Sequence, residues 1–240
     1  MTPPLLQVDG LDGGYGPAPV LRGVSLTAAA GEIVGVLGAN GAGKTTLLRA
    51  LSGTLPVWRG TITLDGRSLG RLSPWKRVAA GLVHVPEGRH VFGAMTVRDN
   101  LEVAALAGRR GQRGNAVSLD QVFELFPRLA QRQRQAAGHL SGGEQQMLAV
   151  GRALVTGARV LVIDEMSAGL APVIVHQLVD GLVTLRADGV AVILVEQSPH
   201  FIAAAVDRVY LLEQGRVVGA GAMADLGGPD RLADLYLGVR

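Results

Sequence analysis

A glycine-rich segment that ends in one lysine and two threonines is the first part of this sequence with the means for chemistry. Gly38 to Thr46 reads GANGAGKTT and matches the pattern G-x-x-x-x-G-K-[ST]. Its glycines let the backbone curl so that N–H groups point inward at an anion. Lys44 can reach the β- and γ-phosphates of a nucleotide, and the Thr45 hydroxyl can bind Mg²⁺. We therefore predict a phosphate-binding loop. The spacing of the glycines does not match the G-x-G-x-x-G pattern, which excludes a dinucleotide-binding fold.

Two acids follow an apolar segment later in the chain. Residues 160–163 read VLVI, which is typical of a buried strand, and Asp164 and Glu165 come directly after it. Two acids can simply end a strand. Beside a phosphate loop they predict catalysis, with Asp164 near Mg²⁺ and Glu165 orienting and deprotonating the attacking water.

A third segment, residues 139–147, reads HLSGGEQQM. Ser141 and Glu144 have the spacing of a capping box, so this segment predicts the start of a helix. A helix N-terminus with a serine hydroxyl and two glycines is also a second candidate anion-binding site. One triphosphate does not need two such sites in the same chain.

The Leu-Ser-Gly-Gly-Glu-Gln segment, upstream of the two acids, resembles the signature of ABC-type ATPases, and this resemblance covers nearly the whole chain. It implies that the signature of one subunit closes over the nucleotide held by another, so that two ATP molecules are sandwiched head to tail. Tyr15 resembles the aromatic residue that stacks on adenine, and Glu87 lies in a segment that resembles the loop contacting Mg²⁺ and a membrane partner. Gln197 occupies the switch segment. The resemblance implies an ATP-binding set of Tyr15, Val20, Gly38, Asn40, Gly41, Ala42, Gly43, Lys44, Thr45 and Thr46. It implies that the signature is Ser141, Gly142, Gly143 and Glu144. The implied metal-binding residues are Thr45, Glu87 and Asp164, and the implied catalytic residues are Glu165 and Gln197.

Four positions depart from the general family pattern. Glu87 replaces the usual Gln, Gln197 the usual His, Met166 a Pro and Ala171 an Asp. Together with the segments VPEGRHVF, GLAP and LVEQ, these departures resemble one ATPase subunit of the branched-chain amino acid importers. That resemblance implies a second, non-identical ATPase subunit (or a homodimer in isolation), two transmembrane permease subunits and, indirectly, a periplasmic or extracellular binding protein.

The resemblance also predicts two unequal ATP sites. Gln197 can donate a hydrogen bond to a γ-phosphate, but it cannot carry a positive charge or shuttle a proton. We therefore expect the signature of this chain to serve the stronger site, which is built on the partner's phosphate loop, and its own loop to hold the slower or mainly structural ATP.

Other functions share some of these features. Urea or amide importers use similar subunits. A soluble ABC-type ATPase of DNA repair would carry a long coiled coil between Lys44 and Ser141, and this interval lacks sustained heptads. A GTPase would need Asn-Lys-x-Asp, which the positions of the two lysines exclude. A binding module with an inactive site is a further alternative, favoured by Gln197.

The elements that must position these residues follow from hydrophobic patterning. We expect a P-loop NTPase core of the α/β class with a mainly parallel sheet and an N-terminal antiparallel β-subdomain. An α-helical subdomain is expected as an insertion at approximately 88–155. Together these parts are expected to form a single ABC ATPase domain, 1–240. Predicted strands span 5–8, 20–27, 32–37, 61–64, 160–163 and 190–195, with a further strand pair around Gly215; predicted helices span 44–52, 97–107, 119–131, 144–155, 173–186, 199–206 and 231–237.

Composition adds exclusions. The 240 residues contain no cysteine, which excludes disulfide scaffolds, Cys-ligated zinc and thiol catalysis, and 48% hydrophobic content excludes disorder. No apolar run approaches the roughly 18 residues of a membrane span, and the N-terminus lacks the pattern of a signal peptide. We expect a cytoplasmic protein, peripheral on the inner face of the membrane, that requires ATP and Mg²⁺ and binds no nucleic acid.

The basic residues are 21 arginines and two lysines, so each lysine is of interest. The phosphate loop explains Lys44, whereas Lys76 has no assigned role and is expected on the surface. Residues 109–113 predict a solvated loop, with membrane phosphates as the less favoured contact. The apolar residues Phe92, Met95, Val97 and Leu101 form either part of a docking face or the core of the helical insertion.

Overall fold

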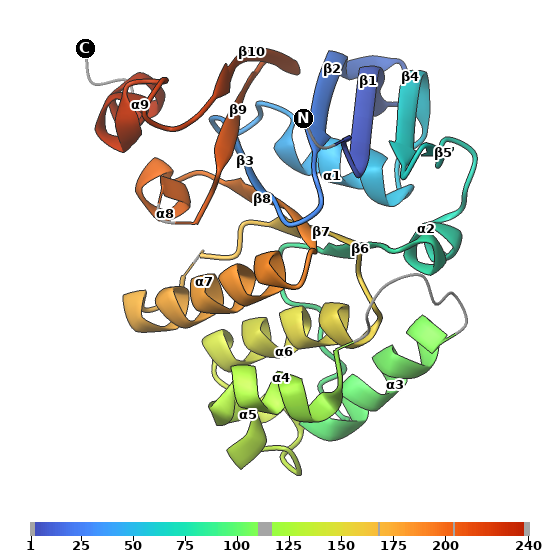
Figure 1. Cartoon of the computed structure of the whole chain (residues 1–240), viewed down its shortest axis with the longest axis vertical. Coiled ribbons are helices and arrows are strands. Elements are labelled where there is room, and N and C mark those ends of the chain that lie inside the picture. Colours follow the sequence, from blue (N-terminus) through green and yellow to red (C-terminus); the bar gives the residue numbers. More distant parts are fainter. Residues whose placement is uncertain (1–2, 110–116, 168, 204, 238–240) are drawn as a thin grey trace.

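The computed structural model describes residues 3–109, 117–167, 169–203 and 205–237, and within them the chain forms two β-sheets covered by helices (Figure 1). The larger sheet has six strands, which run parallel except for β10 at one edge. In spatial order these strands are β10 (Arg216–Gly221), β9 (Arg208–Glu213), β3 (Ile33–Leu37), β8 (Ala191–Glu196), β7 (Val160–Asp164) and β6 (Leu82–Val85). The predicted α/β fold with a mainly parallel sheet is confirmed.

Both faces of this sheet are buried. Alternate residues of a strand point to opposite faces, and on β7 Leu161 and Ile163 pack into one apolar core while Val160 and Val162 pack into another. This burial explains why the strand is a continuous apolar run in the sequence rather than an alternating pattern.

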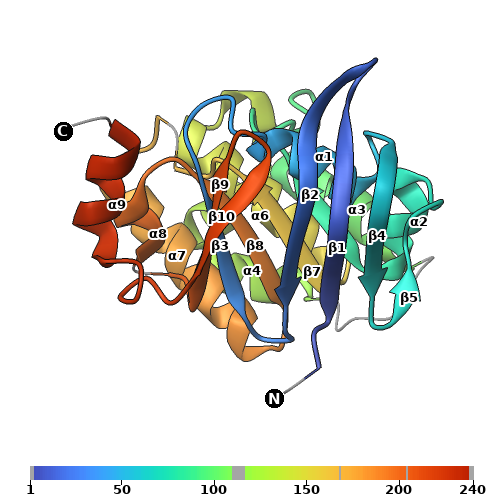
Figure 2. The ribbon, with the colours of Figure 1, turned by 90° about the horizontal axis from the view of Figure 1, so that it is seen from above.

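The smaller sheet is antiparallel throughout, which confirms the expected N-terminal β-subdomain. Its strands, in spatial order, are β2 (Ala18–Ala28), β1 (Leu6–Tyr15), β4 (Val57–Leu64) and β5 (Arg67–Ser68). Figure 2 shows β2, β1 and β4 side by side, seen from above.

The first strand is longer than predicted. The glycines after Val8 indicated turns, but β1 continues to Tyr15, and its pairing with β2 shifts register at three points between Val8 and Gly14. These glycines therefore belong to β-bulges inside one strand, where an extra residue is accommodated without ending the ladder. The turn itself is made by Gly16 and Pro17.

Helix α1 (Lys44–Ser52) lies between the two sheets and has the predicted bounds (Figure 1). Helix α2 (Pro74–Ala80) and strand β6 were not predicted. The Arg77 guanidinium, from α2, donates to the backbone carbonyls of Ala50 and Leu51 at 2.7 and 2.6 Å, so it satisfies acceptors at the C-terminal end of α1.

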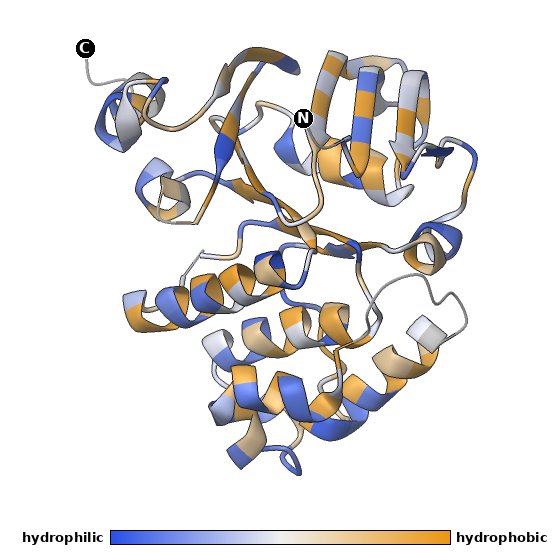
Figure 3. Cartoon of the chain, viewed as in Figure 1, coloured by the Kyte–Doolittle hydropathy of each residue, from blue (hydrophilic) through white to orange (hydrophobic). Residues whose placement is uncertain are grey.

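The remaining helices lie on the opposite side of the larger sheet, some of them against its strands and others packed on those helices (Figure 1). They are α3 (Val97–Arg109), α4 (Leu119–Leu125), α5 (Pro127–Gln131), a 3₁₀ turn (Ala137–His139), α6 (Gly142–Val155), α7 (Pro172–Ala187), α8 (Pro199–Ala203) and α9 (Gly228–Leu237). Figure 3 shows polar and apolar residues alternating along α6 and α7, as in helices with one buried face. The single helix predicted over 119–131 is two helices, because the residue before Pro127 is biased away from helical conformation.

Residues that were expected at the surface or at a docking face differ in their exposure. Lys76 is exposed, and its ammonium lies 5.3 Å from the centre of the Trp75 ring. Val97 and Leu101 are fully buried, so the interpretation of these two as docking residues is wrong, while Phe92 is 45% exposed. The predicted loop at 109–113 lies almost entirely outside the described residues. Within the described part of the chain, no helix combines the length and hydropathy of a membrane span.

Candidate functional site

The segment Gly38–Thr46, termed the phosphate loop below, connects the end of β3 to the start of α1. Gly41 and Gly43 have φ angles of 79° and 107°, in the left-handed region that glycine adopts most readily. Gly38 meets a different limit, because a Cβ atom there would lie 2.3 Å from the carbonyl oxygen of Leu212. Gly43 is also the N-cap of α1, and no side chain caps the first N–H groups of that helix. These N–H groups are thus available for an anion.

Lys44 lies inside its own loop. The ammonium donates to the carbonyl oxygens of Gly38 at 2.7 Å and Ala39 at 3.2 Å, and only 6% of the residue is exposed. Burial lowers the pKa of Lys44, while the negative charges of Glu165 and Asp164 act in the opposite direction. These two bonds hold the ammonium within the loop, 3.9 Å from the Glu165 carboxylate.

The loop is supported from both sheets. The carbonyl of Ala42 accepts a backbone hydrogen bond from Gly215, in the β9–β10 turn, at 2.9 Å. The carbonyl of Gly215 accepts the backbone N–H of Arg22 on β2 at 2.8 Å. Val20 lies against Gly43, since a Cβ there would come within 3.4 Å of it. The strand pair β1–β2 therefore borders the loop directly.

Other predicted nucleotide contacts lie around the loop. Asn40 and Gly41 are exposed, whereas Thr46 is buried behind the loop. The ring of Tyr15 is 45% exposed, and its hydroxyl accepts a hydrogen bond from Arg49 of α1 at 3.0 Å. This bond ties Tyr15 to the helix that follows the loop and leaves ring surface accessible for stacking.

Asp164 ends β7 and is 1% exposed. Its Oδ1 atom is buried without a hydrogen-bond partner among the described residues. Burial raises the pKa of Asp164, and a hydrogen bond from the Thr45 side chain acts against this shift. The negative charges of Glu165 and, to a smaller extent, of the exposed Glu87 also raise the pKa of Asp164.

This donor set fits Mg²⁺. Mg²⁺ is typically held by one or two carboxylates, together with water and phosphate oxygens, rather than by a cage of protein ligands. The unpartnered oxygen of Asp164 and the hydroxyl of Thr45 supply such donors. No group of three or more His, Cys, Asp or Glu side chains able to hold a metal occurs in the part of the chain that the structure describes.

Glu165 lies between the lysine and the switch residue. Its Oε1 atom accepts a hydrogen bond from Gln197 Nε2 at 2.7 Å and lies 3.9 Å from Lys44 Nζ. Its φ angle is 43°, a left-handed conformation that is rare for glutamate. The structure thus brings together Lys44, the adjacent acids Asp164 and Glu165, and Gln197, which come from three separate parts of the sequence.

The segment Ser141–Glu144, termed the signature below, begins α6 at a different place. Ser141 caps the helix by accepting the N–H of Glu144 at 3.4 Å, and Glu144 Oε2 accepts the N–H of Ser141 at 2.9 Å. Glu144 also pairs with Arg132 at 3.0 Å. Gly143 packs closely against Ile174, because a Cβ atom at position 143 would lie 2.6 Å from that side chain. A Cβ at Gly142 would lie 2.7 Å from the Arg89 guanidinium.

Sequence reasoning missed several contacts around these groups. Arg152 of α6 donates to the carbonyl of His90 at 2.7 Å and lies 4.3 Å from the centre of the Phe92 ring. Glu196, next to Gln197, binds Ser167. Each contact joins segments far apart in the sequence, and no local pattern signals it.

Comparisons with known proteins agree with this geometry. The sequence pattern of the family described as ABC transporter matches residues 21–168. High-affinity branched-chain amino acid transport ATP-binding protein BraG of Pseudomonas aeruginosa is 42% identical to this chain, over 98% of the chain and all of BraG. The probable branched-chain amino acid transport ATP-binding protein LivF of Archaeoglobus fulgidus is 34% identical over 98% of the chain and 99% of LivF.

Solved structures share the fold. A structure of an ATP-binding subunit of an ABC transporter superposes with a TM-score of 0.79 at 28% identity, covering 97% of this chain and 94% of that one. An ATP-binding cassette of an ABC transporter in its ADP conformation has a TM-score of 0.81 at 23% identity, covering 98% and 95% of the two chains.

Proposed function

This chain belongs to the ABC transporter family of ATP-binding proteins, and from this premise we propose that it is the ATP-hydrolysing subunit of a branched-chain amino acid importer. The observation that carries the solute class is the similarity to BraG, a branched-chain amino acid transport protein, over 98% of the chain. The observation that carries hydrolysis is the convergence of Lys44, Asp164 and Glu165 at the phosphate loop.

The proposed mechanism starts with ATP in the phosphate loop. The open N–H groups at the start of α1 and the Lys44 ammonium bind the β- and γ-phosphates, and Tyr15 stacks on adenine with Val20 beside it. Thr45, Asp164 and Glu87 would hold Mg²⁺, which supplies charge neutralisation on the phosphate oxygens. Glu165 orients the attacking water and accepts its proton.

Gln197 has a supporting role in this mechanism. Its amide donates to Glu165 Oε1 at 2.7 Å, so it fixes the direction of the base. An amide has a second N–H that can reach a γ-phosphate oxygen, but it cannot take up a proton from the reaction. We propose on this basis that turnover at this chain's own loop is slow compared with that at a loop paired with a protonatable residue.

The signature is proposed to act in trans. Ser141, Gly142 and Gly143 would bind the γ-phosphate of an ATP held by a second, non-identical ATPase subunit, and the same face would allow a homodimer in isolation. Supporting this, Ser141 is exposed and Gly142 is partly exposed at the start of α6, whereas Gly143 is buried. ATP binding would close the two subunits, and hydrolysis would let them separate.

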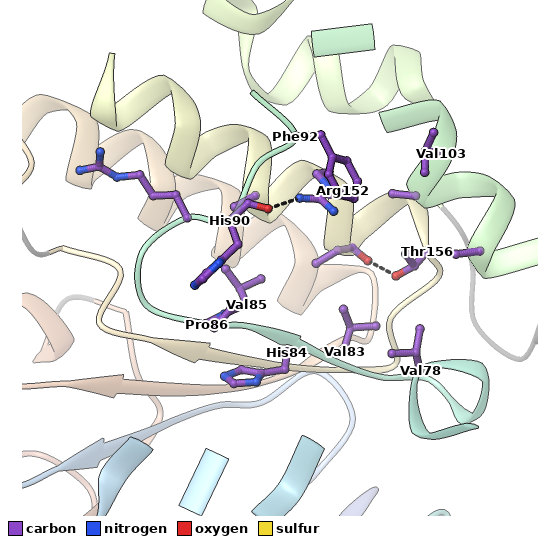
Figure 4. A pocket seen from close by; sticks show the side chains of 15 residues that line it. Val78, Val83, His84, Val85, Pro86, His90, Phe92, Val103, Arg152 and Thr156 are labelled. Carbon is purple, nitrogen blue, oxygen red and sulfur yellow. Dashed lines mark hydrogen bonds between the residues drawn. The ribbon is translucent and has the colours of Figure 1, made fainter. Parts of the chain in front are cut away.

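The permease subunits are proposed to dock beside β6. A cavity of about 320 Å³ opens between β6 and helices α3 and α6 (Figure 4). Val83 and Val85 line it from the strand side, while Phe92, Val103 and Arg152 line it from the helical side. Phe92 and Val103 are exposed large apolar side chains, as expected of residues that a partner covers. This docking would place the chain on the inner face of the membrane, with the solute-binding protein on the opposite side.

The test is to purify the chain with its permease and ATPase partners in lipid and to measure ATP hydrolysis with candidate solutes and their binding protein. We expect stimulation by leucine, isoleucine or valine and none by urea or short amides. Stimulation by urea or an amide alone would replace the proposed solute, and hydrolysis insensitive to any solute would contradict the importer assignment.

A further inference from the structure

Glu196, the last residue of β8, is a buried acid to which the sequence analysis assigned no role of its own. It is 2% exposed. Its Oε1 atom accepts the backbone N–H of Ser167 at 2.9 Å, and its Oε2 atom accepts the Ser167 hydroxyl at 2.8 Å. An ionised carboxylate offers acceptors and no donors, so it can take both donors of one serine. Glu196 therefore joins the end of β8 to the segment that follows β7.

A carboxylate at this buried position carries a large desolvation penalty. Burial raises the pKa of Glu196, and the hydrogen bonds from Ser167 act in the opposite direction. Removing a charge from water is penalised heavily unless directed partners compensate it. A neutral hydroxyl could accept the same N–H at a lower desolvation penalty. The acid is consistent with a need for two directed bonds to the same residue.

The contacts of Glu196 belong to a continuous set between the ends of two neighbouring strands. Val195 accepts the backbone N–H of Glu165 at 3.0 Å, Glu196 binds Ser167, and the Gln197 amide binds the Glu165 carboxylate. Side chains thus extend the pairing of β7 and β8 beyond Asp164, the last residue of the ladder. Glu165 is held on its backbone, on its side chain and through the residue two positions after it.

The backbone of Glu165 needs such support. Its φ angle of 43° lies in the left-handed region, which costs a non-glycine residue about 1–2 kcal/mol. Strained conformations of this kind persist only where the surroundings hold them. On the N-terminal side of Glu165, Asp164 is fixed by its pairing with Val195 in the sheet. On the C-terminal side, Ser167 is fixed by its two hydrogen bonds to Glu196.

We propose that Glu196 is a positioning residue, which keeps Glu165 in its left-handed conformation and its carboxylate aimed at the site by binding Ser167. This inference rests on the proposed function, because Glu196 acts through the candidate base. Without the two bonds, Glu165 can relax toward the right-handed region and its carboxylate turns away from Lys44 and Gln197.

The test uses the assembled transporter with the catalytic acid of the second ATPase subunit substituted, so that the remaining turnover comes from this chain's own site. Glu196→Gln keeps the size of the side chain but removes the charge that strengthens both bonds, and its amide N–H₂ can meet the Ser167 hydroxyl only if that hydroxyl accepts instead of donating. We expect kcat to fall about tenfold with the KM for ATP unchanged within about twofold, since base orientation and not ATP binding is affected. Ser167→Ala removes one of the two bonds and is expected to lower kcat about threefold.

The controls separate positioning from loss of structure. Glu213→Gln changes the exposed acid that ends β9, a strand of the same sheet that is separated from β8 by β3, and should leave kcat unaltered. Ser167→Thr keeps the hydroxyl and should lose less activity than Ser167→Ala. The double variant Glu196→Gln with Ser167→Ala should be no slower than Glu196→Gln alone, because the two residues act as one contact.

Three outcomes overturn the inference. One is a folded Glu196→Gln variant with unaltered kcat; another is equal loss in kcat and ATP affinity; the third is a double variant whose losses multiply. If the parent complex itself has no residual turnover, or if Glu165→Gln leaves that turnover intact, the proposed role of Glu165 fails first, and the inference fails with it.

Discussion

The phosphate loop and the signature each lie at the start of a helix, but they are built differently. At the phosphate loop the N-cap is Gly43, and no side chain occupies the first N–H groups of α1. At the signature, Ser141 and Glu144 cap α6 reciprocally. The phosphate loop also has its own buried cation, Lys44, and faces two acids. The signature has neither arrangement, which supports the proposal that it completes a nucleotide site held by another subunit.

The largest expected effect is on ATP binding by the chain alone. Lys44→Ala should weaken ATP binding about 100-fold, since a charge-assisted contact to the phosphates is lost within a buried loop. Calorimetric titration of ATP into the purified chain measures this. The chain contains a matched control, because Lys76 is its other lysine and lies exposed over Trp75. Equal weakening by Lys76→Ala would contradict the assignment of the loop.

A second comparison concerns how rigidly the two segments are packed. Gly38→Ala places a methyl group against a backbone carbonyl, 2.3 Å from Leu212 O, whereas Gly143→Ala meets the Cγ2 methyl group of the Ile174 side chain at 2.6 Å. A side chain can move and a β-strand carbonyl cannot. We expect the free energy of unfolding to fall by about 3 kcal/mol for Gly38→Ala and by about 1 kcal/mol for Gly143→Ala, measured by urea denaturation. The reverse order would show that the phosphate loop is the softer segment.

Lowering the pH should reduce the free energy of unfolding through His84 on β6, the strand that leads to Glu87. Burial, with the charges of Arg49 and His90, lowers the pKa of His84 on β6 from 6.5 to about 4. The unfolded chain therefore binds more protons than the folded one between these values, and the stabilisation from neutral His84 is complete above pH 6.5 and lost as pH falls toward 4.

The measurement is the difference between wild type and His84→Leu, which removes the contributions of other titrating groups. Between pH 7 and pH 5 the wild type should lose about 2 kcal/mol of unfolding free energy relative to the variant. A constant difference across this range would mean that His84 titrates normally and is accessible.

The smallest effect distinguishes capping from catalysis. Ser118 begins α4 with the same reciprocal capping box as Ser141. Replacing either serine by alanine should reduce stability by about 1 kcal/mol, the usual effect of losing an N-cap. Only Ser141→Ala should also slow ATP hydrolysis by the assembled transporter, by about tenfold. If Ser118→Ala slows hydrolysis to the same extent, the effect of Ser141 is structural.

Much of the phosphate loop could be predicted from sequence because it is local. Glycine, lysine and threonine within nine residues, between an apolar run and a helical pattern, specify both conformation and chemistry. The same holds for Asp164 and Glu165 at the end of a buried strand. The bounds of α1 were predicted correctly because Gly53 ends the helix in a left-handed conformation, as a C-terminal glycine commonly does.

What the sequence left open depends on tertiary packing. The bulges in β1 could not be told from turns, since glycine serves both. Strand β6 is only four residues long and lies between a short helix and Pro86, so no period identifies it. The pair Glu196 and Ser167 is separated by 29 positions, and only the parallel pairing of β7 and β8 brings it together. The left-handed conformation of Glu165 has no local signal either.

The most direct test of the division of labour between the two segments compares two variants of this subunit within the otherwise unaltered transporter. We predict that Ser141→Ala, at the signature, lowers steady-state ATP hydrolysis about tenfold, whereas Glu165→Gln, at the chain's own site, lowers it less than about threefold. A fall of about 10²–10⁴ for Glu165→Gln, the full loss of a general base, would contradict the account, because it would make this chain's own loop the main site of hydrolysis.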